Sequence, residues 1–128
     1  MKTIVIDPVS RIEGHLRVEV TLDGQEVKDA KSSGTMFRGF EQILIGRHPM
    51  DASQIAQRVC GVCPIAHASA STFALDAAFG VADKIPDNGR IIRNLILASN
   101  VLQSHILHFY HLSALDYVDI AAAAATST

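Results

Sequence analysis

The sequence is short of several residue types, and each shortage argues against a class of protein. Its 128 residues include only two cysteines, no tryptophan, 5% aromatic residues and 19% charged residues. The charged fraction is below the roughly 25% that is typical of soluble domains. Two cysteines at CxxC spacing do not make the disulfide framework of a small secreted protein. The net charge of −2 gives no basic field for nucleic acid or an anionic membrane.

Long apolar runs are also missing. No stretch reaches the roughly 18 consecutive apolar residues of a membrane-spanning helix, and the N-terminal run of residues 3–6 ends at Asp7, too early for a signal peptide. Hydrophobic residues nevertheless make up 48% of the chain, and most are aliphatic or alanine. Either the core is unusually large, or apolar surface packs against a partner or further parts of the same protein. We favour the second interpretation.

The pattern predicts an α+β fold that opens with a small antiparallel sheet. Strands are predicted over residues 3–7, 16–22 and 27–33. The second alternates apolar and polar residues, the period of a half-buried strand, and Asp23 and Gly24 are typical of a hairpin turn. We therefore expect one domain with a β-rich part over residues 1–35 and a mainly helical part over residues 36–128.

Helices are predicted over residues 41–45, 52–57, 64–79 and 91–117, the last being one long bundle helix with a broad apolar stripe. Asp51 is expected to cap the second helix, with Gln54 completing a loose capping box. Pro64 suits the first turn of the third helix. Residues 86–89 are predicted to form a loop. Residues 121–125 have the composition of a helix, but no cap is predicted for them.

Both cysteines lie in residues 58–67, RVCGVCPIAH. A CxxC pair brings two soft thiolates close enough to chelate one metal, and a helix N-terminus at Pro64 favours the anionic sulfur. His67 is a candidate third ligand or a hydrogen-bond donor to a thiolate. A structural zinc site needs four ligands, so this is half of a site. A thioredoxin-like redox pair and two buried cysteines without a metal stay open as alternatives.

Other ionisable residues have both structural and functional interpretations. Glu13 is a surface carboxylate or a proton relay near a metal thiolate. Glu41 is a solvated residue at a helix start or a ligand for a hard metal ion. Three histidines recur at every third position of the long helix, each roughly 60° around the helix from the one before, and either pack there or line a wet path or a subunit interface near a redox centre: His105, His108 and His111.

Segments at four places along the chain, in the same order, resemble the large subunit of nickel–iron hydrogenases. Residues 58–67 resemble the family's N-terminal cysteine signature, residues 11–16 its opening motif and residues 37–41 its second motif. The segments over residues 88–95 and 104–112 resemble the long helix that follows the cysteines. The similarity extends to about Asp119, and ordered agreement at four places is far more specific than a lone CxxC.

The resemblance implies metal ligands and a cofactor. Cys60 is expected to be a terminal nickel thiolate and Cys63 a bridge between nickel and iron, with cyanide and carbon monoxide on the iron. Glu41 is expected to help bind Mg²⁺. The family holds the nickel–iron centre on four cysteines, two near each end of the subunit, so this chain is expected to be only the N-terminal portion. The isolated 128 residues are expected to bind nickel weakly and to show no H₂ oxidation.

The resemblance also implies supporting residues and partners. Glu13 is expected to be the proton gate, and His67 is expected to donate a hydrogen bond toward the bridging sulfur. Arg58 is expected to lie beside the centre, on the side that faces an iron–sulfur cluster of a partner subunit. The expected activity is reversible oxidation of H₂ to protons and electrons. The expected partners are a small subunit with iron–sulfur clusters and the remainder of the large subunit, with no nucleic acid.

Three questions stay open at this point. A coenzyme-reducing or energy-converting hydrogenase would share these motifs, and a zinc-binding structural module would share the CxxC and His67. Location is also open, because periplasmic members are exported on the small subunit's signal while others are cytoplasmic. The electron acceptor and any selenocysteine in the remaining sequence are not encoded in these residues.

Overall fold

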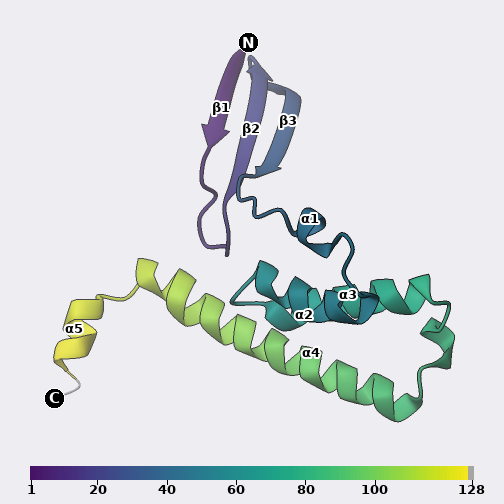
Figure 1. The fold of residues 1–128 in the computed structure, drawn as a ribbon. Helices are drawn as coiled ribbons and strands as arrows, with labels where there is room; N and C mark the ends of the chain where they lie inside the picture. The colour runs from purple at the N-terminus through teal and green to yellow at the C-terminus, as the bar shows by residue number, and fades with distance from the viewer. Residues whose placement is uncertain (127–128) are drawn as a thin grey trace. The chain divides into compact units, whose positions relative to one another are not determined.

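The computed structural model describes residues 1–126, which fall into two compact units. Unit 1 combines Met1–Phe37 with the chain from His108 onward, and unit 2 is Arg38–Leu107. Figure 1 shows a sheet in the first unit and helices in the second. The α+β class and the order of sheet before helices are therefore confirmed.

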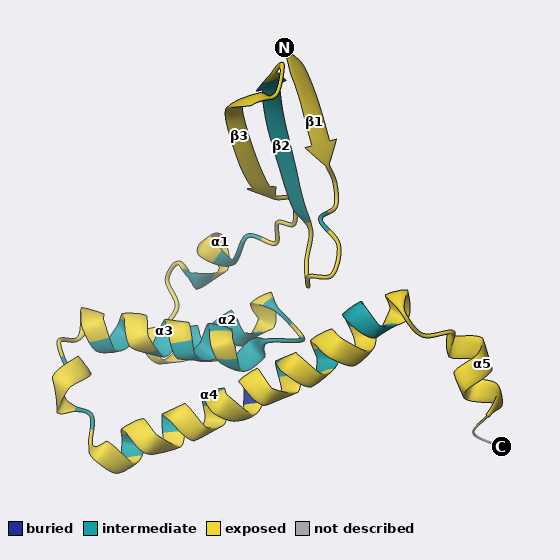
Figure 2. Cartoon of the chain, turned by 180° about the vertical axis from the view of Figure 1, so that it is seen from behind, coloured by how far each residue is buried: buried dark blue, intermediate teal, exposed yellow. Residues whose placement is uncertain are grey.

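Unit 1 contains a three-stranded antiparallel sheet in the order β1-β2-β3. Its strands are β1 (Lys2–Ile6), β2 (Leu16–Asp23) and β3 (Glu26–Gly34). In the register, Val20 of the central strand faces Ile4 on one side and Ala30 on the other. The hairpin turns at Gly24, whose φ of 63° favours glycine. Figure 2 shows that β2 is partly buried while β1 and β3 are exposed. The three predicted strands and the hairpin are thus confirmed.

The second part of unit 1 begins with a π-helical segment, η4 (His108–Ser113), and a 3-10 turn, η5 (Ala114–Asp116). The last helix is α5 (Ile120–Ala125). The expectation that this helix has no cap is wrong, because the Asp119 side chain accepts a hydrogen bond from the backbone N–H of Ala122 at 3.0 Å. Asp119 lies just before the alanine run, where a carboxylate satisfies an unpaired helix donor.

Unit 2 is built from four α-helices. They are α1 (Phe40–Leu44), α2 (Ala52–Ala56), α3 (Pro64–Ala78) and α4 (Asp87–Leu107). The 3-10 turns η1 (Pro49–Asp51), η2 (Gln57–Val59) and η3 (Ala82–Lys84) connect them. The capping box predicted for Asp51 and Gln54 is wrong. Asp51 is the N-cap residue of α2, as predicted, but its side chain makes no capping hydrogen bond. Asp51 also ends η1, whose own N-cap His48 accepts from the Met50 N–H through its ring.

The long helix differs from its prediction at both ends. It begins at Asp87, inside the predicted loop, because Asp87 suits the positive end of a helix and pairs with Arg90 at 2.7 Å. Its α-helical geometry ends at Leu107, and the π-helical η4 follows. The three histidines at every third position therefore do not share one α-helical face, since the α-helical period stops between His105 and His108.

Polar contacts join the helices of unit 2. Arg93 of α4 pairs with Asp76 of α3 at 2.6 Å, and the Asp76 side chain is only 13% exposed. Ser53 of α2 and Thr72 of α3 share a hydrogen bond of 3.0 Å. These contacts fix α3, the helix that follows the cysteines, against α2 and α4 (Figure 1).

The described residues contain no buried hydrophobic side chain, and Asn100 is the one buried residue among them. Figure 2 shows α4 mostly in the colour of exposed residues. Its apolar side chains at 49–63% exposure include Ile91, Ile92, Leu95, Ile96, Leu102 and Ile106. An unusually large core is thus excluded for residues 1–126, and cover from outside this chain stays a prediction. None of the described helices has the length and apolar character that a membrane crossing needs.

Candidate metal centre

The cysteines lie in a tight turn between two helical runs. The run of α2 and η2 ends at Val59, and Cys60 follows with extended backbone angles (φ −138°, ψ 132°). Cys63 is the N-cap residue of α3, and Pro64 occupies the first helical position as predicted. Proline is favoured there because the first helical N–H has no partner within the helix. The turn therefore presents both cysteines at the start of α3.

Backbone groups of this turn face the sulfur of the first cysteine. The Cys63 N–H donates to the Cys60 Sγ at 3.3 Å, and a hydrogen bond to sulfur favours its anionic form. One turn into α3, the His67 N–H donates to the Cys63 carbonyl at 3.4 Å. Helical geometry therefore returns His67 to the side of the turn where the cysteines lie.

Cys60, Cys63 and His67 form a compact set of possible metal ligands. The two Sγ atoms and a ring nitrogen of His67 all lie within 4.8 Å of one another, and all three residues are half-buried. No other such group of three or more His, Cys, Asp or Glu side chains occurs within residues 1–126. Two thiolates and an imidazole suit soft and borderline metals, including nickel, iron and zinc. The donor set is smaller than the four ligands of a closed site.

Glu41 and Arg58 lie outside this cluster. Glu41 is exposed in the first turn of α1, where a carboxylate interacts favourably with the helix dipole. Arg58 is exposed as well, and it is its backbone carbonyl that makes a contact, accepting a hydrogen bond from Arg38 at 2.7 Å. The sequence singled out Arg58, whereas Arg38 is the arginine that holds this turn.

Glu13 belongs to unit 1, in the loop between β1 and β2, and is exposed. The loop turns at Arg11 and Gly14, with φ of 63° and 86°. The Arg11 guanidinium forms two hydrogen bonds with the Asp116 carboxylate. The hydrogen bond with Asp116 raises the pKa of Arg11 above its ordinary value, so Arg11 stays positively charged at physiological pH.

The π-helical segment contributes a second contact to this loop. The His108 Nε2 lies 2.9 Å from the Arg11 carbonyl, and its Nδ1 lies 3.3 Å from the Ser113 hydroxyl. A carbonyl only accepts, so Nε2 donates to it, and Nδ1 shares the second hydrogen bond with the Ser113 hydroxyl. Residues five apart face different sides of an α-helix and approach one side in the wider π-helix. The π geometry thus lets Ser113 orient His108.

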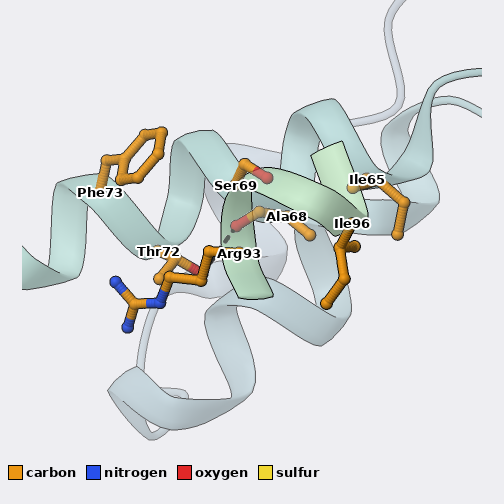
Figure 3. A pocket seen from close by; sticks show the side chains of 7 residues that line it. All are labelled: Ile65, Ala68, Ser69, Thr72, Phe73, Arg93 and Ile96. Carbon is orange, nitrogen blue, oxygen red and sulfur yellow. Dashed lines mark hydrogen bonds between the residues drawn. The ribbon is translucent and has the colours of Figure 1, made fainter. Parts of the chain in front are cut away.

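A small open hollow of about 150 Å³ lies between α3 and α4. Figure 3 shows its lining, with the Thr72 hydroxyl bonded to the Ala68 carbonyl at 2.9 Å. Its lining residues are Ile65, Ala68, Ser69, Thr72, Phe73, Arg93 and Ile96. None of the three clustered ligands lines it, so this hollow belongs to the helix packing rather than to the metal cluster.

The contacts of Arg38, His108 and Asp116 were not predicted from the sequence. Asp116 and Arg11 are 105 positions apart, and no local spacing links them. Arg38 lies in the segment whose Glu41 was predicted to bind a metal ion. The contact of the Arg38 guanidinium with the cysteine turn is visible only in the fold.

Known proteins match nearly all of the chain. A family model described as nickel-dependent hydrogenase matches residues 38–128, and a model described as HoxL-like matches residues 3–33. The large subunit of the periplasmic [NiFeSe] hydrogenase of Desulfomicrobium baculatum is 66% identical over 115 residues, which are 90% of this chain and 22% of that protein. The hydrogenase-2 large chain of Escherichia coli K12 is 50% identical over 120 residues, or 94% of this chain and 21% of that one.

Solved structures agree with these matches. The reduced, active Ni-Fe-Se hydrogenase of Desulfomicrobium baculatum superposes with a TM-score of 0.69 at 65% identity, covering 91% of this chain and 24% of that chain. The as-isolated oxidised Ni-Fe-Se hydrogenase of D. vulgaris Hildenborough gives 0.68 at 66% identity. The chain spans about a fifth of the length of the curated relatives it matches. The matches over most of its length show that the chain belongs to the nickel-dependent hydrogenase family.

Proposed function

We propose that this chain supplies two of the four cysteine ligands of a nickel–iron centre that oxidises H₂ reversibly to protons and electrons. The observation that carries the proposal is the cluster of Cys60, Cys63 and His67 at the start of α3, within 4.8 Å, in a chain of the nickel-dependent hydrogenase family. On this proposal the chain is the N-terminal portion of a single large-subunit domain.

The donor set fits such a group. Two thiolates at one turn suit nickel and iron, and a half-buried imidazole beside them can donate a hydrogen bond to a sulfur. Cys60 is the proposed terminal ligand of nickel, Cys63 the bridge to iron, and His67 the hydrogen-bond donor. The nickel–iron centre, with cyanide and carbon monoxide on iron, supplies the site of heterolytic H₂ cleavage. The remaining two ligands, cysteine or selenocysteine, come from sequence outside these residues.

The proton route uses two groups of this chain. The Cys60 Sγ and then the Glu13 carboxylate would carry toward solvent the two protons that each H₂ yields. Two electrons leave separately, through iron–sulfur clusters of a small-subunit partner. The contacts of Arg11 with Asp116 and His108 support this role for Glu13, since they hold the loop that carries the carboxylate.

Further roles follow on the same proposal. Glu41 contributes to a Mg²⁺ site, because a carboxylate is the ligand type that a hard cation prefers. Arg58 lies beside the centre and faces the partner's cluster. The identity of 66% to the [NiFeSe] relative, against 50% to hydrogenase-2, supports the selenium-containing type for the assembled enzyme.

The test compares metal content and H₂ uptake of the complete complex that contains this chain, as wild type and as Cys63→Ser. We expect nickel and iron in the wild type and loss of both metals and of H₂ uptake in the variant, because a hydroxyl does not replace a bridging thiolate. Ala66→Ser, at an exposed position of the same helical turn, is the matched control and should keep both.

A structural zinc site gives a different result. It would leave zinc as the bound metal, no H₂ uptake in the wild type, and a Cys63→Ser variant that binds its metal more weakly. Selenium measured in the same digest tests the subtype. Zinc without nickel in the active complex would overturn the proposal.

A further inference from the structure

The helical run that precedes Cys60 ends with carbonyl groups that need partners. The last carbonyls of any helix lack intrahelical donors and carry the negative end of its dipole. Here the run of α2 and η2 stops at Val59, and the extended backbone of Cys60 cannot continue it. The carbonyls of Arg58 and Val59 therefore point out of the helix directly before a candidate metal ligand.

One arginine meets both carbonyls. The Arg38 Nη2 donates to the Arg58 carbonyl at 2.7 Å and also to the Val59 carbonyl. The guanidinium lies over the Phe40 ring, 5.0 Å from its centre, in cation–π geometry. Gly39 between them has a φ of 69° and begins α1, a conformation that other residues adopt only with strain. The segment from Arg38 to Phe40 is thus shaped to present one cation to the end of η2.

We propose that Arg38 is a positioning residue for Cys60: it fixes the two peptide units from which the cysteine projects and offsets the negative end of the helical run beside the sulfur. The inference rests on the proposed function. It assigns to the segment around Glu41 a purpose separate from cation binding, namely to hold the cysteine turn.

A solvated arginine without a positioning role is expected to make at most single surface contacts. Exposed charged side chains gain little from single surface contacts. Arg38 is exposed, yet one of its nitrogens joins two successive carbonyls and its plane is held by an aromatic ring. Arg47 of the same unit is an exposed arginine for which no such contact occurs among the described residues, so it provides the matched control.

The experiment uses the complete complex with Arg38→Gln, Arg38→Lys or Arg47→Gln. Nickel per complex is measured at limiting nickel, and the carbon monoxide and cyanide stretching bands are recorded by infrared spectroscopy. For Arg38→Gln we expect about tenfold less nickel, in line with losses of supporting contacts at metal sites. In the fraction that assembles, the bands should shift to lower wavenumber, because uncompensated carbonyl dipoles increase electron density at the metals. Arg38→Lys retains the charge and should restore the wild-type bands, while Arg47→Gln should match wild type throughout.

The infrared readout separates positioning from a general loss of stability. Wild-type band positions in Arg38→Gln, with or without a lower yield of complex, would overturn the inference, as would equal effects of Arg38→Gln and Arg47→Gln. A wild-type complex with zinc and no nickel would instead refute the proposed function. The two failures are therefore distinguishable.

Discussion

The turn of residues 60–63 and the loop of residues 11–15 are both irregular backbone, but different parts of the chain hold them. The cysteine turn is bounded by helices on both sides, and His67, the third candidate ligand, lies one helical turn away. Arg38, which donates to the Arg58 carbonyl just before this turn, is 20 positions from Arg58. The loop with Glu13 is held by contacts from Arg11 to Asp116 and His108, which are 105 and 97 positions away.

On the proposed function, this difference separates two kinds of task. Metal ligands need fixed mutual geometry, and a turn between helices supplies it within a short piece of chain. A proton-carrying carboxylate needs a set position relative to groups elsewhere, which only long-range contacts provide. Long-range contacts close large loops and form only with the whole fold, so the position of Glu13 depends on more of the chain than that of Cys60.

Among the variants that test this comparison, Glu13→Gln is expected to have the largest effect on H₂ oxidation. The amide keeps the shape of the side chain but carries no transferable proton, so H₂ oxidation should fall by about 10²–10⁴-fold while nickel and iron contents stay the same. Turnover and metal analysis of the complete complex check this. Glu26→Gln, on an exposed strand of unit 1, is the control, and unchanged turnover in Glu13→Gln would remove Glu13 from the proton route.

His67→Ala is expected to act on the metal rather than on proton transfer. Loss of a supporting imidazole typically lowers metal affinity by about 10–100-fold, so nickel occupancy should drop in a competition with a chelator. His67→Gln, which retains a hydrogen-bond donor, should recover part of it. Equal occupancy in wild type, alanine and glutamine variants would mean that the closeness of His67 to the two sulfurs has no role in metal binding.

The smallest effect is expected from Asp116→Asn, which weakens the contact of Asp116 with Arg11 and leaves the contacts of the cysteine turn unchanged. Exposed ion pairs contribute little, so amide hydrogen exchange in residues 11–15 should speed up by a factor of about two to five, with a similar drop in turnover and no change in nickel. Asp29→Asn, which removes an exposed pair with Lys31 on β3, should leave this loop unchanged. Loss of nickel in Asp116→Asn would show that the two regions are not held independently.

Local patterns were enough for the parts that depend on local physics. Alternation in residues 16–22 and the turn at Gly24 predicted the hairpin, and Pro64 marked the start of α3. The spacing of Cys60, Cys63 and His67 was enough to predict that these side chains lie close together, because the turn between the cysteines and one turn of helix to His67 fix their separations.

Features set by competing or distant contacts were not predicted. Asp51 precedes α2 as expected, but it is also the last residue of η1, and its side chain makes no capping hydrogen bond. The end of α4 was not predicted, because neither Leu107 nor His108 is a helix-breaking residue. The change to π geometry there accompanies the contacts of His108 with Arg11 and Ser113.

The central claim is that Cys60 and Cys63 bind nickel and iron, and nickel-edge X-ray absorption of the complete complex tests it most directly. We expect nickel in sulfur-rich coordination, with iron present, and loss of that signature when Cys60 is replaced by serine. Zinc in place of nickel, or nickel whose sulfur coordination is unchanged in Cys60→Ser, would contradict it.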